Sequence, residues 1–291
     1  MGRIYDALRK AEQERRQRGG AATRTEPTLI LDEELPGSGA RVEPLFGDDG
    51  ARAEPVIEPP TIAAPSATAL VEPGAELVAV SDPASPAAEY LRAVKARIAR
   101  TLAEQGHRSL LVTSPGRGDG KTFVASNLAL LLAAEVGTRV LLVDADLRRP
   151  RLHTLFGATR SPGLSEIGDG RLDWWTAVVT APWNGLQVMP AGGPTSRPAE
   201  TLNTPAARGF FAAAREAYDY VIIDAPPVLP VADAAVLAGH LDAVVMVTRQ
   251  DHTPRQALVA AGEALARAHV LGVVLNAMEG RGPLRRSYYE Y

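Results

Sequence analysis

SLLVTSPGRGDGKT, residues 109–122, is the stretch that decides the fold of this chain. A run of apolar and β-branched residues, typical of a buried strand, leads into a glycine-rich turn, and residues 122–135 follow with helical periodicity. Backbone N–H groups in such a turn converge on phosphate oxygens. Lys121 is expected to reach the β- and γ-phosphates and the Thr122 hydroxyl to ligate Mg²⁺, while Pro115 stands where the strict pattern has glycine. The candidate nucleotide-binding residues are Gly116, Arg117, Gly118, Asp119, Gly120, Lys121 and Thr122.

Two further apolar strands end in aspartates. VLLVDAD, residues 140–146, spaces Asp144 and Asp146 two apart, so both can face the same side. YVIID, residues 220–224, ends in Asp224. Ligands of doubly wound sheets bind beyond the carboxyl ends of the strands, so all three aspartates should meet the glycine loop. Asp224 is expected to hold Mg²⁺, and Asp144 or Asp146 to accept a proton or assist the metal together with Thr122.

Short Val/Leu/Ile runs alternate with helical stretches from residue 87 onward. This alternation predicts an α/β fold with a doubly wound, mainly parallel sheet. Helices are expected over 87–102, 122–135, 205–217 and 254–268, and strands over 109–113, 139–144, 186–190, 220–224, 242–248 and 270–276. A further short strand is predicted over 77–80, as the first ordered piece of the chain.

The N-terminal third has a different composition. Residues 1–20 predict a short basic amphipathic helix, which either docks on a partner or anionic membrane surface or frays in solvent. Residues 21–86 are rich in proline and acidic side chains and predict a disordered, extended linker. The resulting division is an arm (1–20), a linker (21–86), a P-loop domain (87–278) and a flexible tail (279–291).

Composition excludes several classes of protein. The chain has no cysteine among its 291 residues, which rules out disulfide frameworks, thiolate zinc sites and cysteine nucleophiles. A formal net charge of -3 argues against nucleic acid as a partner. No apolar run approaches the roughly 20 residues that cross a bilayer, and no signal peptide is recognisable, so a cytoplasmic location is expected.

Three segments carry a resemblance to a known family. Residues 113–122, 140–150 (VLLVDADLRRP) and 221–227 (VIIDAPP) resemble the Walker A, Walker A′ and Walker B motifs of bacterial tyrosine kinases, the autokinases of capsule and exopolysaccharide synthesis. The resemblance covers residues 87–291 and implies a deviant-Walker P-loop ATPase fold with ATP and Mg²⁺ as cofactors. It implies adenine contact for Asn276, for which strand-end capping is the alternative. The implied catalytic constellation is Lys121, Thr122, Asp144, Asp146 and Asp224.

Two other segments are similar to features of that family. Tyr288, Tyr289 and Tyr291 lie in the last four residues, and the resemblance implies that they are autophosphorylation sites presented to a neighbouring subunit. The spacing of Glu89, Arg92 and Lys95 is similar to a Glu-x-x-Arg-x-x-Arg segment that packs against the next subunit of a ring. Lysine at the third position weakens a bidentate contact. A tail without function and a solvated charged face are the respective alternatives.

The resemblance also implies partners. They are further copies in a ring-like homo-oligomer, a separate transmembrane chain-length regulator and a tyrosine phosphatase, with the chain peripheral at the inner membrane. Two other functions compete with the autokinase. One is a nucleotide-switch ATPase of the partitioning type, which carries a signature lysine where this chain has Gly116. The other is a non-catalytic ATP-binding scaffold of a polysaccharide export complex, which stays open because binding and transfer use the same loop.

Overall fold

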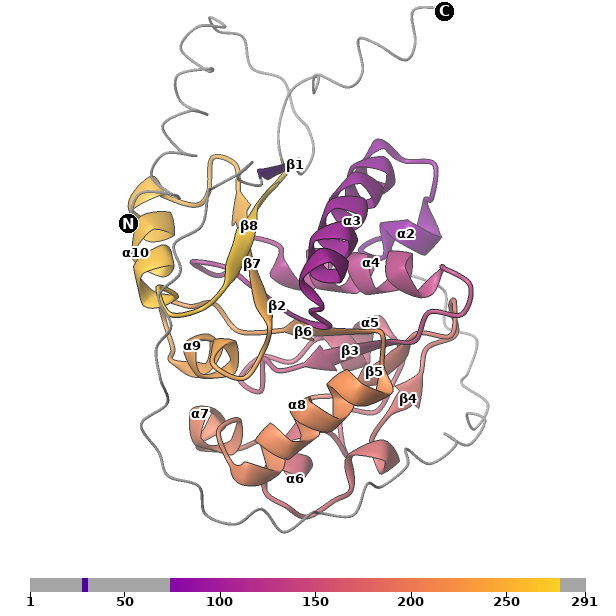
Figure 1. Ribbon diagram of the computed structural model, residues 1–291, viewed down its shortest axis with the longest axis vertical. Coiled ribbons are helices and arrows are strands. Elements are labelled where there is room, and N and C mark those ends of the chain that lie inside the picture. The colour runs from indigo at the N-terminus through magenta and orange to yellow at the C-terminus, as the bar shows by residue number, and fades with distance from the viewer. Residues whose placement is uncertain (1–27, 31–73, 278–291) are drawn as a thin grey trace, which may run out of the picture.

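The computed structural model describes residues 28–30 and 74–277, which form one α/β unit around an eight-stranded sheet (Figure 1). All neighbouring strands are parallel except at the two edges, where the pairs β1–β8 and β4–β5 are antiparallel. The predicted doubly wound, mainly parallel sheet is therefore confirmed. In spatial order the strands are β1 (Thr28–Ile30), β8 (Val270–Asn276), β7 (Ala243–Arg249), β2 (Ser109–Thr113), β6 (Tyr220–Asp224), β3 (Val140–Asp144), β5 (Gln187–Met189) and β4 (Val179–Thr180).

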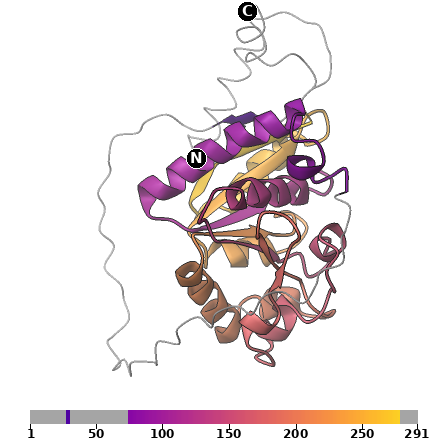
Figure 2. The same ribbon diagram turned by 90° about the vertical axis from the view of Figure 1, so that its right-hand side faces the viewer.

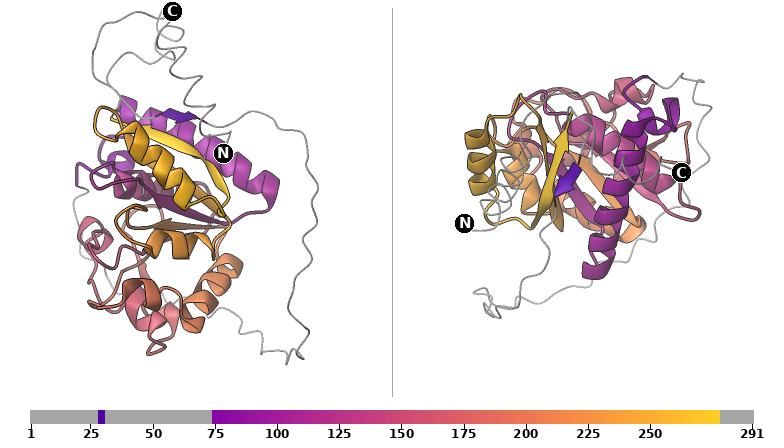
Figure 3. Two further views of the ribbon diagram at one scale, coloured as in Figure 1. Left: turned by 90° about the vertical axis from the view of Figure 1, so that its left-hand side faces the viewer. Right: turned by 90° about the horizontal axis from the view of Figure 1, so that it is seen from above.

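Helices cover both faces of the sheet. In Figure 1, α3 and α4 lie to the right of β7 and β8, whereas α9 and α10 lie to their left, and the view from above in Figure 3 agrees. Figure 2 shows α3 running beside α4. One face carries α2 (Val78–Ser81), α3 (Pro86–Gln105), α4 (Lys121–Ala133) and α5 (Leu152–Leu155). The other carries α6 (Leu164–Gly168), the 3₁₀ turn η1 (Trp174–Thr176), α7 (Pro198–Thr201), α8 (Pro205–Ala217), α9 (Asp233–Ala238) and α10 (Arg255–Ala264).

Each central strand contributes side chains to both cores. In β2, Leu110 and Val112 pack with the α3–α4 face, while Leu111 points to the α8 face. All five residues of β2 are buried, as they are in β3. Burial on both faces explains why these strands have continuous apolar sequences rather than alternating ones.

The strand predicted over residues 77–80 is wrong, because residues 78–81 form the short helix α2. Leu77 is fully buried among the side chains of the α3–α4 face. Asn127 of α4 holds the backbone on either side of it: its Oδ1 accepts from Ala79 N at 2.9 Å, and its Nδ2 donates to Glu76 O at 2.8 Å. Tertiary contacts with α4 thus override the local strand propensity, and packing reaches upstream of the expected boundary at residue 87.

Helix boundaries differ from the predicted ones by a few residues. The helix expected over 87–102 runs from Pro86 to Gln105, where Ser85 accepts from Ala88 N at the start and Gly106 ends it at φ 67°. The helix expected over 254–268 stops at Ala264. The basic segment 1–20, most of the linker and the tyrosine cluster lie outside the described residues.

Sheet order determines where the functional residues meet. β6 lies between β2 and β3, so the ends of all three strands adjoin. Asp224 is the register partner of Val112 on β2 and of Asp144 on β3. The glycine loop after β2 and the acidic ends of β3 and β6 therefore share one edge of the sheet.

Candidate active site

The glycine loop joins β2 to α4 with two left-handed residues. Gly118 has φ 82° and Gly120, at the N-cap of α4, has φ 98°. A Cβ on Gly120 would overlap Asn276 Nδ2, so only glycine fits there. The loop leads directly into the N-terminus of α4, and a glycine-rich loop before a helix N-terminus is an arrangement that binds phosphate.

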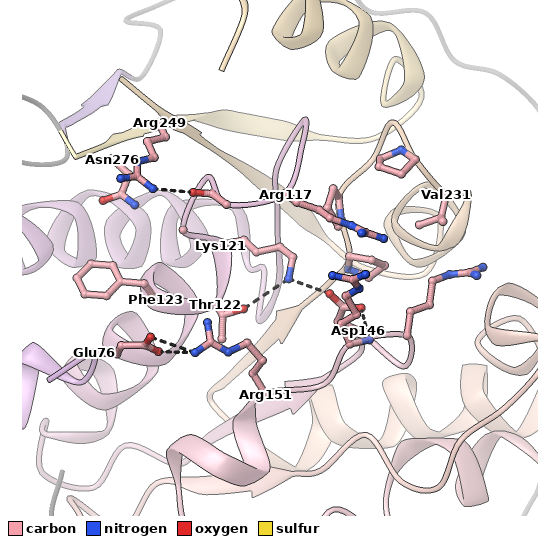
Figure 4. A pocket seen from close by; sticks show the side chains of 17 residues that line it. Glu76, Arg117, Lys121, Thr122, Phe123, Asp146, Arg151, Val231, Arg249 and Asn276 are labelled. Atoms are coloured by element: carbon pink, nitrogen blue, oxygen red, sulfur yellow. Dashed lines mark hydrogen bonds and ion pairs between the residues drawn. The ribbon is translucent and has the colours of Figure 1, made fainter. Parts of the chain in front are cut away.

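Lys121 is the first residue of α4, and in Figure 4 dashed lines join it to Asp146 and Thr122. Its Nζ is 2.9 Å from Asp146 Oδ2, 3.7 Å from Asp224 Oδ1 and 3.4 Å from Thr122 Oγ1. Burial alone would lower the pKa of Lys121, but the carboxylates of Asp224 and Asp146 raise it above its ordinary value. Lys121 therefore stays positively charged at the base of the glycine loop.

Asp144 is fully buried at the end of β3. Its Oδ2 accepts from Arg151 N at 3.0 Å and from Leu152 N at 2.9 Å, whereas its Oδ1 has no hydrogen-bond partner. Burial, helped by the neighbouring charge of Asp224, raises the pKa of Asp144 to about 7. A buried carboxylate oxygen without a donor is unfavourable, so this atom is suited to a cation.

Asp224 on β6 shares that condition. Its side chain is buried, and its Oδ1 likewise has no hydrogen-bond partner. Burial raises the pKa of Asp224, and the charge of Lys121 opposes the rise. Two buried carboxylates are therefore register partners on neighbouring strands, and each has one oxygen that accepts no hydrogen bond, although Asp224 Oδ1 is 3.7 Å from Lys121 Nζ. Thr122 Oγ1 lies near the same lysine, and together the three side chains fit a hard divalent cation.

Lys121 and Thr122 line a cationic cavity of about 410 Å³, and Figure 4 shows the side chains around it. Arg148, on the loop after β3, forms a bidentate pair with Asp233 at 2.8 and 3.0 Å. Arg151, on the same loop, contacts both carboxylate oxygens of Glu76 at 3.0 and 3.1 Å. The excess of positive charge matches a polyphosphate. The charged residues lining the cavity are Glu76, Arg117, Lys121, Asp146, Arg148, Arg149, Arg151 and Arg249.

Most of the sequence-predicted site residues come together here. Arg117, Gly118, Gly120, Lys121, Thr122, Asp146 and Asn276 line the cavity. Asp144 and Asp224 lie beside Lys121 but are buried behind the cavity wall. Asp119 does not line the cavity, because its side chain turns inward to Thr253 Oγ1 at 2.6 Å. Asn276 Nδ2 donates to the Asp119 carbonyl at 3.0 Å.

Sequence reasoning missed Glu76 and Arg249 as cavity residues. Glu76 falls in the predicted linker, and only the fold brings it to Arg151, 75 residues away. Arg249 is the last residue of β7. Its place at the carboxyl end of a strand is the one local feature from which a cavity role could have been predicted.

The predicted subunit-contact residues lie elsewhere, on α3. Arg92 forms an ion pair with Glu89, and its Nη2 donates to Pro83 O at 2.7 Å. Lys95 forms an ion pair with Glu135 of the same chain, just beyond α4. The side chain of Glu89 is 68% exposed. The three phosphoacceptor candidates Tyr288, Tyr289 and Tyr291 lie outside the described residues.

Comparison with known proteins matches this geometry. Residues 110–290 match the family described as the CobQ/CobB/MinD/ParA nucleotide binding domain. The tyrosine-protein kinase YwqD of Bacillus subtilis is 33% identical over 217 residues, covering 74% of this chain and 90% of YwqD. The succinoglycan biosynthesis transport protein ExoP of Rhizobium meliloti is 33% identical, but the chain spans only 26% of its length.

Solved structures show the same likeness. The kinase domain of the Escherichia coli tyrosine kinase ETK superposes with a TM-score of 0.68 at 30% sequence identity, covering 74% of this chain and 84% of that domain. This chain therefore shares its fold with that domain over most of both chains.

Proposed function

The chain belongs to the family of bacterial tyrosine-protein kinases, and on that premise we propose that it transfers phosphate from ATP to its own C-terminal tyrosines. The acceptors are Tyr288, Tyr289 and Tyr291, each presented by a neighbouring copy of the chain. Phosphate transfer to tyrosine is the activity named for its relatives, and ExoP is named for polysaccharide synthesis and transport. The process served is accordingly exopolysaccharide synthesis and export.

The position of Lys121 carries this proposal. Its charged Nζ lies at the N-terminus of α4, where loop N–H groups and the helix dipole already favour phosphate oxygens. When ATP enters, Nζ is positioned to exchange its contact with Asp146 for the transferred phosphoryl group. Arg117 and Arg149, which also line the cavity, add positive charge at its mouth.

Thr122, Asp144 and Asp224 are the residues that would hold Mg²⁺. The observation that supports this assignment is that Asp144 Oδ1 and Asp224 Oδ1 are buried and accept no hydrogen bond. A Mg²⁺ ion supplies charge neutralisation for the phosphates and needs only one or two carboxylates beside them. Binding would also relieve the repulsion between the two buried carboxylates.

Asp146 is placed to accept the proton of the tyrosine hydroxyl. Of the three aspartates it is the one that lines the cavity, so an incoming phenol can reach it. Its Oδ1 is fixed by Arg149 N at 3.1 Å, and its Oδ2 by Lys121. Asp144 is too deeply buried to meet a tyrosine directly.

Intact-mass spectrometry after incubation with ATP and Mg²⁺ tests both whether phosphate is transferred and whether the transfer runs between copies of the chain. Wild-type chain should gain phosphate, while Lys121→Ala and the triple Tyr288/Tyr289/Tyr291→Phe variant should gain none alone. Mixing the two variants separates the modes: phosphate on the Lys121→Ala chain establishes transfer between copies. A mixture in which neither chain gains mass, beside an active wild type, refutes transfer in trans.

Residues Glu89, Arg92 and Lys95 form the proposed subunit contact. Glu89 and Lys95 are both paired within their own chain, with Arg92 and Glu135, but the Glu89 side chain is 68% exposed and can also meet a neighbour. A ring-like homo-oligomer would let each tail reach the next cavity, and accumulated phosphate would loosen it by repulsion. Glu89→Ala should reduce the assembled mass in light scattering; an unchanged mass contradicts the assignment.

A membrane partner and a tyrosine phosphatase complete the proposal. No helix within residues 28–30 and 74–277 is long and apolar enough to cross a bilayer. The name of ExoP as a transport protein supports the proposal that this chain lies at the inner membrane through a separate transmembrane chain-length regulator. Residues 1–20 would be the contact, and the phosphatase would reset the tail. Deleting residues 1–20 should lower the amount of chain that sediments with membranes containing that regulator; unchanged sedimentation counts against this contact.

A further inference from the structure

A buried carboxylate sits inside the glycine loop that is expected to hold phosphate. The Asp119 side chain is 1% exposed, and a negative charge at this place repels phosphate rather than attracting it. Its Oδ2 accepts from Gly116 N, at the start of the loop, at 3.0 Å. Its Oδ1 accepts from Thr253 Oγ1 at 2.6 Å. Both oxygens of this buried group are thus used for contacts within the protein.

The second partner comes from the loop between β7 and α10. Thr253 Oγ1 donates to Asp119 and accepts from Arg249 N at 2.8 Å, so one hydroxyl joins the two loops. Arg249, the last residue of β7, and His252 of the β7–α10 loop make two more contacts with glycine-loop carbonyls. Arg249 Nη1 donates to Gly118 O at 3.4 Å, and His252 Nε2 lies 3.0 Å from Arg117 O. Three consecutive residues of the phosphate loop are therefore held from outside it.

We propose that Asp119 and Thr253 are positioning residues that preorganise the glycine loop for nucleotide. The inference rests on the proposed function only in that nucleotide binds at this loop. Glycine-rich backbone has many accessible conformations, and fixing one of them before binding reduces the entropy lost on binding. Asp119 fixes the loop at its start through Gly116 N, and Thr253 fixes Asp119 to the neighbouring β7–α10 loop.

Neither residue is placed to touch the nucleotide. The cavity is lined by Arg117, Gly118, Gly120 and Lys121 from the glycine loop, but not by Asp119. Thr253 does not line it either. Substituting Thr253 therefore removes no direct contact to nucleotide, and a loss of affinity measures how well the glycine loop and the neighbouring Arg249 are held in place.

The experiment uses the full chain and Mg–ADP as the probe, measured by titration calorimetry. Thr253→Val keeps the shape of the side chain but removes the hydroxyl, leaving a buried carboxylate oxygen without its donor, and should weaken Mg–ADP binding about tenfold. Thr253→Ser restores the hydroxyl and should bind within about twofold of wild type. Thr176→Val is the matched control, because the exposed Thr176 hydroxyl donates only to Asp173 O.

Kinetics separate positioning from general destabilisation. Thr253→Val should raise the KM for ATP about tenfold and leave kcat within about threefold, because Lys121 and the three aspartates are untouched. Asp119→Asn keeps one acceptor oxygen, and should weaken Mg–ADP binding less than Asp119→Ala does. That pair keeps the test open if Thr253→Val does not fold.

Wild-type affinity for Mg–ADP in folded Thr253→Val, or equal loss in Thr253→Ser and Thr253→Val, would overturn the proposal. Because Mg–ADP binding involves no transfer, this outcome differs from failure of the kinase proposal. If instead the kinase proposal failed, the wild-type chain would bind Mg–ADP and the variants would weaken binding as predicted, but the wild type would never gain phosphate on its tail.

Discussion

Replacing Asp144 with asparagine should stabilise the metal-free chain while abolishing phosphate transfer. Asparagine retains an oxygen that can accept from Arg151 N and Leu152 N, as Asp144 Oδ2 does. It removes the buried negative charge that lies beside Asp224. Ionising Asp144 in the folded protein lowers its free energy of unfolding. The variant avoids this loss, so its free energy of unfolding should be higher than that of the wild type by the same amount.

The raised pKa gives the size and the sign of this effect. Moving the pKa of Asp144 from 3.8 to about 7 corresponds to about 4 kcal/mol, at about 1.36 kcal/mol per pH unit. Because the pKa of Asp144 is raised in the folded state, the wild type has its full stability below pH 3.8, where Asp144 is protonated both folded and unfolded. It loses about 4 kcal/mol of that stability as the pH rises from 3.8 through about 7. The advantage of Asp144→Asn should thus be about 2 kcal/mol larger at about pH 8.5 than at about pH 5.5.

Urea unfolding in the presence of a chelator measures this difference, because bound metal would mask the repulsion. In thermal unfolding, about 4 kcal/mol corresponds to a rise in Tm of very roughly 8–16 °C for a folded region of this size. Asp173→Asn, at an exposed position, is the control and should change stability by less than about 0.5 kcal/mol at either pH. An Asp144→Asn variant that is less stable than wild type at about pH 8.5, or whose gain is the same at both pH values, would refute the reasoning.

Three further substitutions have definite expected outcomes. Gly120→Ala should cost about 1–3 kcal/mol and abolish nucleotide binding, because φ is 98° and the new methyl would overlap Asn276; calorimetry with Mg–ADP checks it. Gly209→Ala, inside α8 with open space around it, should instead raise stability by about 0.5–1 kcal/mol in urea unfolding. Glu166 is partly desolvated, yet hydrogen bonds from Gly193 N and other donors lower its pKa. The contribution of ionised Glu166 to the free energy of unfolding is therefore present above pH 4.5 and is lost as the carboxylate becomes protonated at lower pH. Glu166→Gln should be less stable than the wild type at neutral pH, but its stability should fall less in acid.

The central part of the site could be predicted from the sequence because its signals are local. The glycine loop, the strand before it and the helix after it are consecutive in the chain, and each aspartate follows an apolar run. Parallel topology then brings Asp144 and Asp224 into register without further information. For Lys121, Thr122 and these aspartates, pattern and position were sufficient.

Long-range contacts were beyond that reasoning. Residues 77–80 have the composition of a strand, and only the buried Asn127 of α4 explains why the backbone there is helical. The role of Asp119 depends on Thr253, which is 134 residues away. The ion pair of Lys95 with Glu135 joins residues that are 40 apart in the chain. Each case depends on packing between elements that no local pattern specifies.

Glu76 and Asn276 line the same cavity, and this has a practical consequence for anyone who engineers the chain. Glu76 stands near the start of the continuously described region and Asn276 near its end, yet both line the same cavity. A version trimmed to residues 74–277 would therefore have both of its new ends at the entrance to the nucleotide cavity. A tag, dye or carrier protein joined at either end would crowd that entrance.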